Sequence, residues 1–268
     1  MKGNYVQVKK QQGIAYVSFN RADKYNALDF NAFIAIDRVI KQLKKDRDLQ
    51  VVILYGVGNN FCSGLDIKSV MKSPLQAVRI LLKGLPGNAN LAQRISLGWR
   101  QLPVPVIAAI EGCCFGGGMQ IALGADFRVV SPTAQFSIME AKWGLVPDMA
   151  GLVTLREIMP KDQALLLTMT AAVLTADEAL KKGLVTEVVV DPMQRAETLA
   201  QMLMQTSPDA NAAIKLSINL SWTASIRCLL RRETFSQIKL LMGRNRAIAA
   251  LRQGKEPERP YEKRQSRW

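Results

Sequence analysis

The sequence predicts an α/β fold built around a largely parallel sheet. Short apolar runs of strand length alternate with longer stretches whose apolar residues recur at helical spacing. Glycine-rich turns join several of the apolar runs to the helices that follow them. The chain has 268 residues, of which 49% are hydrophobic and 22% charged, a balance that allows a sizeable buried core.

In the first part of the chain, residues 5–9 and 14–19 are expected to form two strands joined by the turn at Gln12-Gly13. Residues 28–45 form the first expected helix, because their apolar side chains fall on one helical face. Residues 51–55 are continuously apolar and are expected to be a short buried strand.

In the middle of the chain, residues 90–101 are expected to form a helix that stops before two nearby prolines. The apolar run 104–110 is the next expected buried strand, and its glycine-rich end opens into a helix over 117–123. Residues 127–130 and 135–137 are further strand candidates.

From Met159 onward the sequence is nearly all helical in pattern. We therefore expect an α/β core over residues 1–190 and a helical C-terminal region over 191–268. This region is a candidate for packing on a neighbouring subunit.

The charge of the chain is strongly basic and uneven. The formal net charge is +14, and the segment 227–268 contributes +8 of it, from twelve basic and four acidic residues. This basic segment has three interpretations: a solvated basic helix, attraction of a polyanionic small molecule, or binding of nucleic acid. No nucleic-acid motif or aromatic platform accompanies the basic residues, so nucleic acid is the least favoured partner.

The chain contains no histidine, which excludes a Ser-His-Asp triad, a Cys-His pair and His-ligated metal. No metal site is expected. Four cysteines are present, and without an export signal we expect reduced, mostly packing thiols. Acid and base chemistry must therefore come from carboxylates, lysines, tyrosines or thiols.

The beginning of the sequence, residues 1–13, is polar and shows no secretory signal. The longest apolar runs are too short to cross a bilayer. A cytoplasmic protein without membrane contact is the expectation.

Two glycine-containing loops carry the candidate chemistry, at residues 61–68 and 111–120. Glycines at a strand-to-helix turn let a ligand approach the backbone and leave free N–H groups at the positive end of the helix. Two such amides from separate loops can bracket one carbonyl oxygen that is becoming an oxyanion. An isolated glycine triplet would more simply permit tight packing, and neither loop has the sequence of a phosphate-binding loop.

Five segments in the same order resemble those of the crotonase (enoyl-CoA hydratase/isomerase) superfamily. They are N-R-A-D-K-Y-N-A-L at 20–28, F-C-S-G-L-D-I-K at 61–68, the stretch 105–120 ending in F-G-G-G-M-Q, the pieces A-D and A-Q-F at 125–126 and 134–136, and T-A-D-E-A followed by K-G-L-V within 175–185. One departure is Ala22, where the family usually has proline.

The resemblance implies a crotonase-like ββα spiral core with a helical C-terminal trimerisation region. It also implies an acyl-CoA substrate, with coenzyme A as part of the substrate and no permanently bound cofactor. A homotrimer or homohexamer is the implied assembly. The two oxyanion donors fall on the backbone N–H groups of Leu65 and Gly117.

The same resemblance places the CoA contacts on the first loop and on the helix start. The implied CoA-binding residues are Leu65, Asp66, Ile67, Lys68 and Gly117. Arg21 and Lys24 are candidate partners of the CoA phosphates, and a solvated surface role is the alternative for both.

Hydratases of this family generally use two glutamates, and this chain departs from that pattern. Gln120 occupies the first position and Glu140 the second. An amide cannot exchange a proton at neutral pH, although it can orient a water or a thioester. We therefore expect Glu140 to be the principal acid/base, with a surface or helix-capping role as the alternative.

Asp148 is a second candidate acid. By composition it is typical of a helix N-cap, because it follows a proline and precedes a predicted helix. By resemblance it lies where dienoyl-CoA isomerases place a second acidic catalyst. Because Gln120 replaces the first glutamate, double-bond isomerisation of an unsaturated acyl-CoA is favoured over hydration. An enoyl-CoA hydratase and an acyl-CoA-binding homologue without turnover remain the alternatives.

Overall fold

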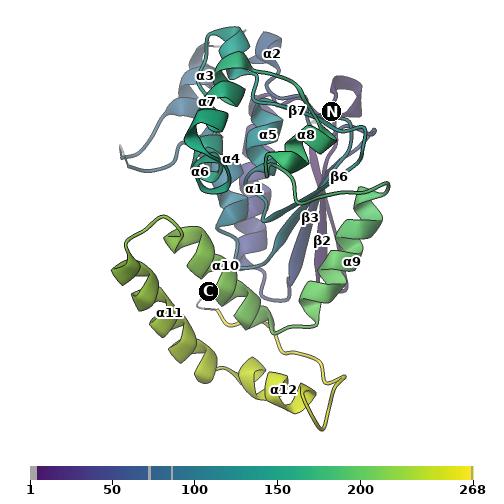
Figure 1. Cartoon of the computed structure of the whole chain (residues 1–268), viewed down its shortest axis with the longest axis vertical. Helices are drawn as coiled ribbons and strands as arrows, with labels where there is room; N and C mark the ends of the chain where they lie inside the picture. The colour runs from purple at the N-terminus through teal and green to yellow at the C-terminus, as the bar shows by residue number, and fades with distance from the viewer. Residues whose placement is uncertain (1–4, 72–73, 86, 267) are drawn as a thin grey trace.

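A six-stranded sheet forms the centre of the protein, as seen in the computed structural model (Figure 1). The structure describes residues 5–71, 74–85, 87–266 and 268. The strand order is β1-β2-β3-β4-β6-β9; β1 and β2 pair antiparallel and all other neighbours are parallel. The strands are β1 Val6–Gln11, β2 Ile14–Phe19, β3 Val51–Gly56, β4 Val106–Ile110, β6 Phe127–Val130 and β9 Glu187–Val188.

A second, three-stranded sheet lies beside the glycine-rich turn. It contains β5 (Cys113–Phe115), β7 (Gln135–Ser137) and β8 (Leu174–Thr175), with β5 parallel and β8 antiparallel to β7. The backbone N–H of Gly116 donates to the carbonyl of Ser137 at 2.8 Å. The small sheet therefore fixes the start of the helix that follows β5.

The helices surround the large sheet and extend beyond it. In chain order they are η1 Ala22–Lys24, α1 Phe30–Lys45, α2 Ile67–Met71, α3 Pro74–Leu81, α4 Leu91–Arg100, α5 Gly117–Ala122, η2 Glu140–Trp143, α6 Gly151–Ile158, α7 Lys161–Thr170, α8 Ala176–Lys181, α9 Pro192–Met204, α10 Pro208–Ser221, α11 Ile226–Leu241 and α12 Arg244–Arg252.

Both faces of the large sheet are covered. On one face α1, α4 and α5 enclose the main hydrophobic core, whose largest buried side chain is Trp99. On the other face α9 packs its small residues Ala196 and Ala200 against Ile53 and Ile107 of the strands. The predicted α/β class with a largely parallel sheet is confirmed.

Local chemistry explains where the observed elements differ from the expected ones. The first helix begins at Phe30, because the Asp29 side chain accepts a hydrogen bond from the Ala32 amide at 2.9 Å and caps it. The buried strand expected from residue 104 begins at Val106, after Pro105, which has no N–H to donate.

The C-terminal region is helical, as predicted. Helices α10 and α11 run side by side at the end of the molecule away from α5 and β7 (Figure 1). Buried Lys215 of α10 ties this region to the core, with its ammonium 2.7 Å from Asp126. None of the helices in the described part of the chain is long and apolar enough to cross a bilayer. The division into domains at residue 190 stays a prediction.

Candidate active site

The two glycine-containing loops lie against each other. Cys62 donates from its backbone to the carbonyl of Cys113 at 3.0 Å, and Phe115 donates back to Cys62 at 2.9 Å. Gly64 has a positive φ of 96°, and a Cβ placed on it would stand 2.9 Å from the Phe115 carbonyl and 3.5 Å from the Gly117 nitrogen. Only glycine fits this approach, which brings the backbone around Gly64 next to the start of α5.

The predicted donor amides belong to this junction. Leu28 donates to the carbonyl of Gly64, and Asp66 donates to the carbonyl of Leu28, so the Leu65 N–H between them points away from Leu28. Gly117 is the first residue of α5, and its N–H has no acceptor within the helix. The structure thus brings the Leu65 and Gly117 segments together, and among the described residues neither amide donates to a backbone carbonyl. Their shared role on one carbonyl oxygen stays a prediction.

Glu140 lies beside the same turn. A Cβ on Gly116 would stand 3.7 Å from Glu140 Oε1, and that oxygen accepts a hydrogen bond from Gln120 Nε2 at 2.6 Å. The other oxygen, Oε2, is buried and has no partner among the described residues. Burial raises the pKa of Glu140, the hydrogen bond from Gln120 opposes this, and the nearby negative charge of Asp148 adds to it.

Gln120 is completely buried. Its Oε1 accepts hydrogen bonds from the backbone amides of Met149 at 2.9 Å and Gly151 at 3.0 Å. Because both lone pairs of that oxygen are engaged, the side chain has no acceptor left for a water or a substrate. The sequence predicts that Gln120 lies in the site, but it does not show that the Gln120 oxygen is bound by these two backbone amides.

Asp148 is not the N-cap of the following helix. That position belongs to Ala150, which has a positive φ of 65° and offers no side-chain cap. Asp148 as a whole residue is exposed to solvent, and partial burial of its carboxyl raises its pKa.

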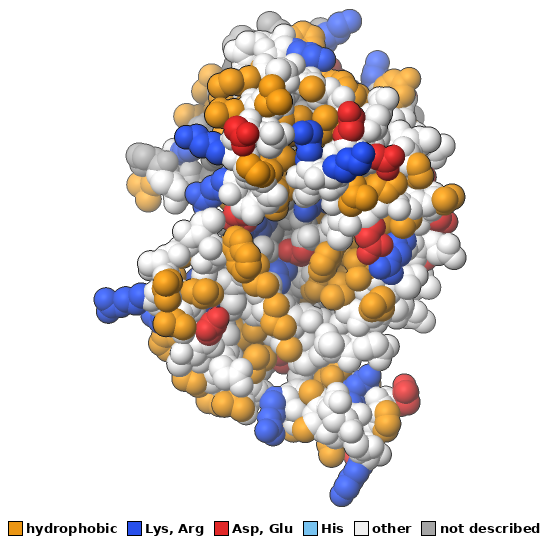
Figure 2. Space-filling model, in the orientation of Figure 1, with side chains coloured by type: hydrophobic (Ala, Val, Ile, Leu, Met, Phe, Trp, Pro, Cys, Tyr) orange, Lys and Arg blue, Asp and Glu red, His pale blue; other side chains and the backbone are white. Residues whose placement is uncertain are grey.

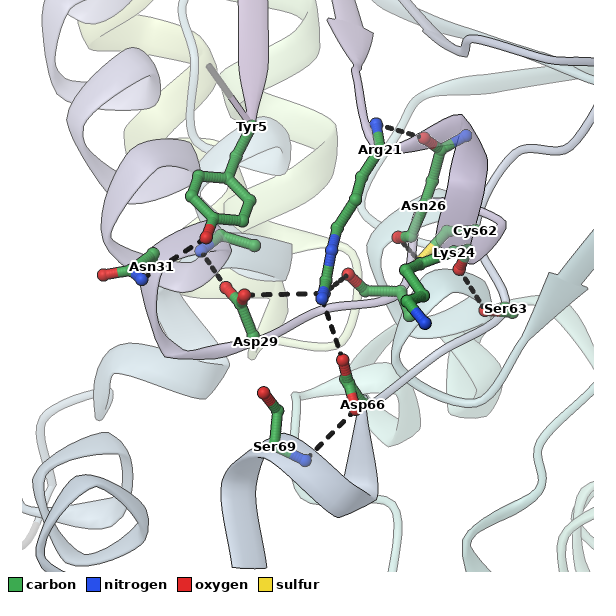
Figure 3. A network of polar contacts seen from close by, with 12 residues as sticks. Tyr5, Arg21, Lys24, Asn26, Asp29, Asn31, Cys62, Ser63, Asp66 and Ser69 are labelled. Atoms are coloured by element: carbon green, nitrogen blue, oxygen red, sulfur yellow. Dashed lines mark hydrogen bonds and ion pairs between the residues drawn. The ribbon is translucent and has the colours of Figure 1, made fainter. Parts of the chain in front are cut away.

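Among the expected CoA-binding residues, Arg21 and Asp66 point toward each other in a network of polar contacts (Figure 3). The Arg21 guanidinium is held by the chain itself: it lies 3.0 Å from Asp66 and 3.4 Å from Asp29 and donates to the Ala27 carbonyl. Asp66 also accepts from the backbone amide of Ser69 at 3.1 Å, in the first turn of α2. Arg21 and Asp66 therefore shape the loop beside the site.

Lys24 and Lys68 are the two lysines among the expected CoA-binding residues. Both side chains are exposed, and within the described residues neither takes part in an ion pair. Ile67 is half-buried at the start of α2. The two lysines are thus exposed cations that are available to a phosphate.

Asn26 holds the loops of the site together. In the sequence it is visible only as one residue of the 20–28 segment, without an assigned role. It is buried with a positive φ of 57°, a conformation that asparagine tolerates better than most residues. Its Oδ1 accepts from the Arg21 amide at 2.8 Å, and its Nδ2 donates to the carbonyls of Val57 and Asn60 at 3.0 and 2.7 Å. The side chain joins three loops.

Replacing Asn26 by Ala is expected to lower the free energy of unfolding by about 3 kcal/mol, because three half-buried backbone groups lose a hydrogen-bond partner. Denaturant titration measures this change. Asn31→Ala is the matched control: that residue is exposed on α1, and we expect a change within about 0.5 kcal/mol. Equal stabilities of the two variants would contradict the role of Asn26.

Comparison with known proteins places the chain in one family. The profile of the enoyl-CoA hydratase/isomerase family matches residues 9–238. The chain belongs to the enoyl-CoA hydratase/isomerase family. The predicted membership of the crotonase superfamily is confirmed.

Among family members, carnitinyl-CoA dehydratase of Shigella flexneri is 36% identical over 195 residues, which is 72% of each chain. The enoyl-CoA hydratase of Bacillus anthracis superposes with a TM-score of 0.87 at 25% identity, covering 97% of this chain and 100% of that one. The enoyl-CoA hydratase of Mycobacterium tuberculosis H37Rv gives 0.85 at 28% identity, covering 96% and 98%.

The cysteines near the site of this family member are not activated thiols. Cys62 and Cys114 are buried, and burial raises the pKa of Cys62 to about 12 and that of Cys114 well above its usual value. Burial also raises the pKa of half-buried Cys113. The described residues contain no group of three or more His, Cys, Asp or Glu that could hold a metal ion. The thiols near the site are therefore poor candidates for acid/base chemistry, and carboxylates stay the predicted proton carriers.

Proposed function

We propose that this enoyl-CoA hydratase/isomerase family member moves a double bond along the chain of an unsaturated acyl-CoA. The observation that supports it is the state of Gln120, whose oxygen is occupied by two backbone amides. The two-glutamate pattern of hydratases needs a carboxylate at this position to activate water. This chain has Glu140 and Asp148 instead, and isomerisation consumes no water.

In the proposed reaction the thioester oxygen accepts hydrogen bonds from the Leu65 and Gly117 amides. A carboxylate, Glu140, takes a proton from C2 of a 3-enoyl-CoA, and the electron pair of that C–H bond passes into a dienolate whose charge lies on the thioester oxygen. Return of the proton to C4 leaves the double bond between C2 and C3. Glu140 can perform both transfers, and Asp148 serves as the second carrier where the proton must travel further, as in a 3,5-dienoyl-CoA.

A second candidate reaction is the reversible addition of water. It is supported by the 36% identity to a carnitinyl-CoA dehydratase. In that reaction Glu140 or Asp148 would activate the water alone. The third hypothesis, binding of acyl-CoA without turnover, requires that no thioester be altered.

An ultraviolet absorbance assay with 3-enoyl-, 3,5-dienoyl- and 2-enoyl-CoA separates these hypotheses. We expect the double bond of the first two substrates to move faster than water adds to the third. Asp148→Asn is expected to slow the 3,5-dienoyl reaction more than the 3-enoyl reaction, because only the former needs the longer transfer. Faster hydration of 2-enoyl-CoA would favour the second candidate, and tight CoA binding with every thioester unchanged would favour the third.

Coenzyme A enters this proposal as part of the substrate, with no other resident cofactor. Lys24 and Lys68 are proposed to meet its phosphates, and the loop from Leu65 to Ile67 to line its adenine and pantetheine portions. Arg21 acts on this loop through its ion pair with Asp66. The cytoplasmic location stays a prediction.

We also propose that the C-terminal helices join subunits into the predicted homotrimer or homohexamer. Large hydrophobic side chains stand exposed there, and Figure 2 shows them gathered over the lower helices. They include Ile214, Ile218, Trp222, Ile226, Leu230, Phe235, Ile238, Leu241 and Met242. Such a patch is typical of a protein interface. Sedimentation is expected to give three or six times the chain mass of 29.7 kDa, and a monomer would contradict the proposal.

A further inference from the structure

The orientation of the Gln120 amide is fixed by its neighbours. The backbone amides of Met149 and Gly151 can only donate, so the atom they meet must be the oxygen. The NH₂ end of the side chain therefore faces Glu140, where it lies 2.6 Å from Oε1. A flipped amide would place its NH₂ group against two backbone N–H donors and its oxygen against the Glu140 carboxylate.

The turn that carries Asp148 is built around the same side chain. A Cβ on Gly151 would stand 2.8 Å from Gln120 Cγ and 3.0 Å from Oε1, so this turn closes on Gln120 only because residue 151 is glycine. The two amides that Gln120 holds come one and three residues after Asp148. The position of Asp148 at the site thus depends on Gln120.

Glu140 is left with two unlike oxygens. Oε1 is engaged by Gln120, whereas Oε2 is buried and has no protein partner among the described residues. A buried carboxylate oxygen without a partner is costly, and such atoms in folded proteins call for a functional explanation. A bound substrate that presents an acidic C–H to Oε2 supplies one.

We propose that Gln120 is a positioning residue that holds Oε1 of Glu140 and the Asp148 turn at once, so that Oε2 is the atom of Glu140 that moves the proton. The inference rests on the proposed function in one respect, the acid/base role of Glu140. The amide cannot exchange a proton, so it keeps Oε1 as an acceptor in every step of the cycle.

The electrostatics of the site are simple enough to test this role. Burial chiefly raises the pKa of Glu140 and the charge of Asp148 adds to this, whereas hydrogen bonds from the Glu140 backbone amide and from Gln120 lower it. A change at residue 120 that removes the donor must therefore raise the pKa of Glu140 further.

Gln120→Glu separates the donor from the acceptor role. The new carboxylate keeps the volume of the side chain and can still accept from Met149 and Gly151, but its second oxygen meets Glu140 Oε1 where a hydrogen bond donor stood. Two carboxylates at that distance share one proton, so one of the pair titrates at higher pH than Glu140 does in the unaltered protein. Gln120→Met is the matched variant that removes donor and acceptor together.

The measurement is a ¹³C NMR titration of the side-chain carboxyl of Glu140, assigned with Glu140→Gln. In Gln120→Glu the carboxyl at position 120 is followed as well, and we expect the higher midpoint of the pair to lie at least about one pH unit above that of Glu140 in the unaltered protein, with the unfolding midpoint little changed. Gln120→Met is expected to raise the Glu140 titration as well and also to lower the unfolding midpoint, because two buried amides lose their acceptor. If neither carboxyl of the pair in Gln120→Glu titrates above Glu140 of the unaltered protein, the proposal is overturned.

The pH dependence of kcat/KM provides the second readout. The acid limb in Gln120→Glu is expected to move to higher pH by the same amount as the NMR titration. Below that limb, kcat/KM should fall about tenfold for each pH unit by which the limb moves. The NMR titration needs no turnover, so absence of any isomerase activity would reject the proposed function while leaving the role of Gln120 to be decided by the titration alone.

Discussion

Replacing Glu140 by Gln is expected to lower the kcat for double-bond isomerisation by about 10²–10⁴-fold, the usual contribution of a general acid/base. The substitution removes the proton carrier and changes little else. The oxygen of the new amide can still accept the hydrogen bond that Gln120 donates to Oε1. Initial rates with 3-enoyl-CoA measure the loss, and a rate within about tenfold of the unaltered enzyme would show that another group carries the proton.

The stability of the same variant provides a control. The pKa of Glu140 in the folded protein is raised above its ordinary value, chiefly by burial. A carboxyl with a raised folded-state pKa stabilises the fold when protonated, and this contribution is lost as the pH rises through the folded-state pKa. Glu140→Gln carries no such dependence, so above that pH the variant is expected to be at least as stable as the unaltered protein. A variant that unfolds more easily at neutral pH would show that its lost activity comes from misfolding.

The backbone framework was predictable because its signals are local. Short continuous apolar runs identify β3 and β4, and the family motifs identify Leu65, Gly117 and Glu140. The strands β8 and β9 were not predicted, because each has only two residues and such a pair shows no alternation of burial.

The polar contacts of the site were not predictable, because they join residues far apart in the chain. The sequence shows a glutamine at position 120, but only the fold shows that its oxygen meets amides about thirty residues later. From the sequence, Arg21 is a candidate partner of a phosphate, but the structure shows that its guanidinium is paired with Asp66. Asp148 resembles a helix cap until the helix is seen to begin after Ala150. In each case the residue type is compatible with two roles. The residues that lie next to it in the folded protein decide which role it has.

Replacing Gly117 by Pro is expected to lower kcat by about 10²–10³-fold with little change in KM, because it deletes a hydrogen bond donor to the developing oxyanion. The backbone accommodates the change. Gly117 is the first residue of α5, where proline is well tolerated. Gly116 has φ 50° and ψ −120°, the mirror image of the extended conformation favoured before proline, which glycine adopts readily.

Gly117→Ala is the matched control, since it keeps the N–H and adds the same Cβ. That atom would meet Met149 Sδ at 2.8 Å and Leu28 Cδ1 at 3.1 Å, both at the ends of flexible side chains that can shift. The alanine variant should therefore lose much less activity than the proline variant. Equal losses would show that crowding at Met149 causes the defect, and the Gly117 amide would then have no special part in holding the thioester oxygen. The difference between the two variants isolates one N–H group, which is the quantity on which the oxyanion assignment depends.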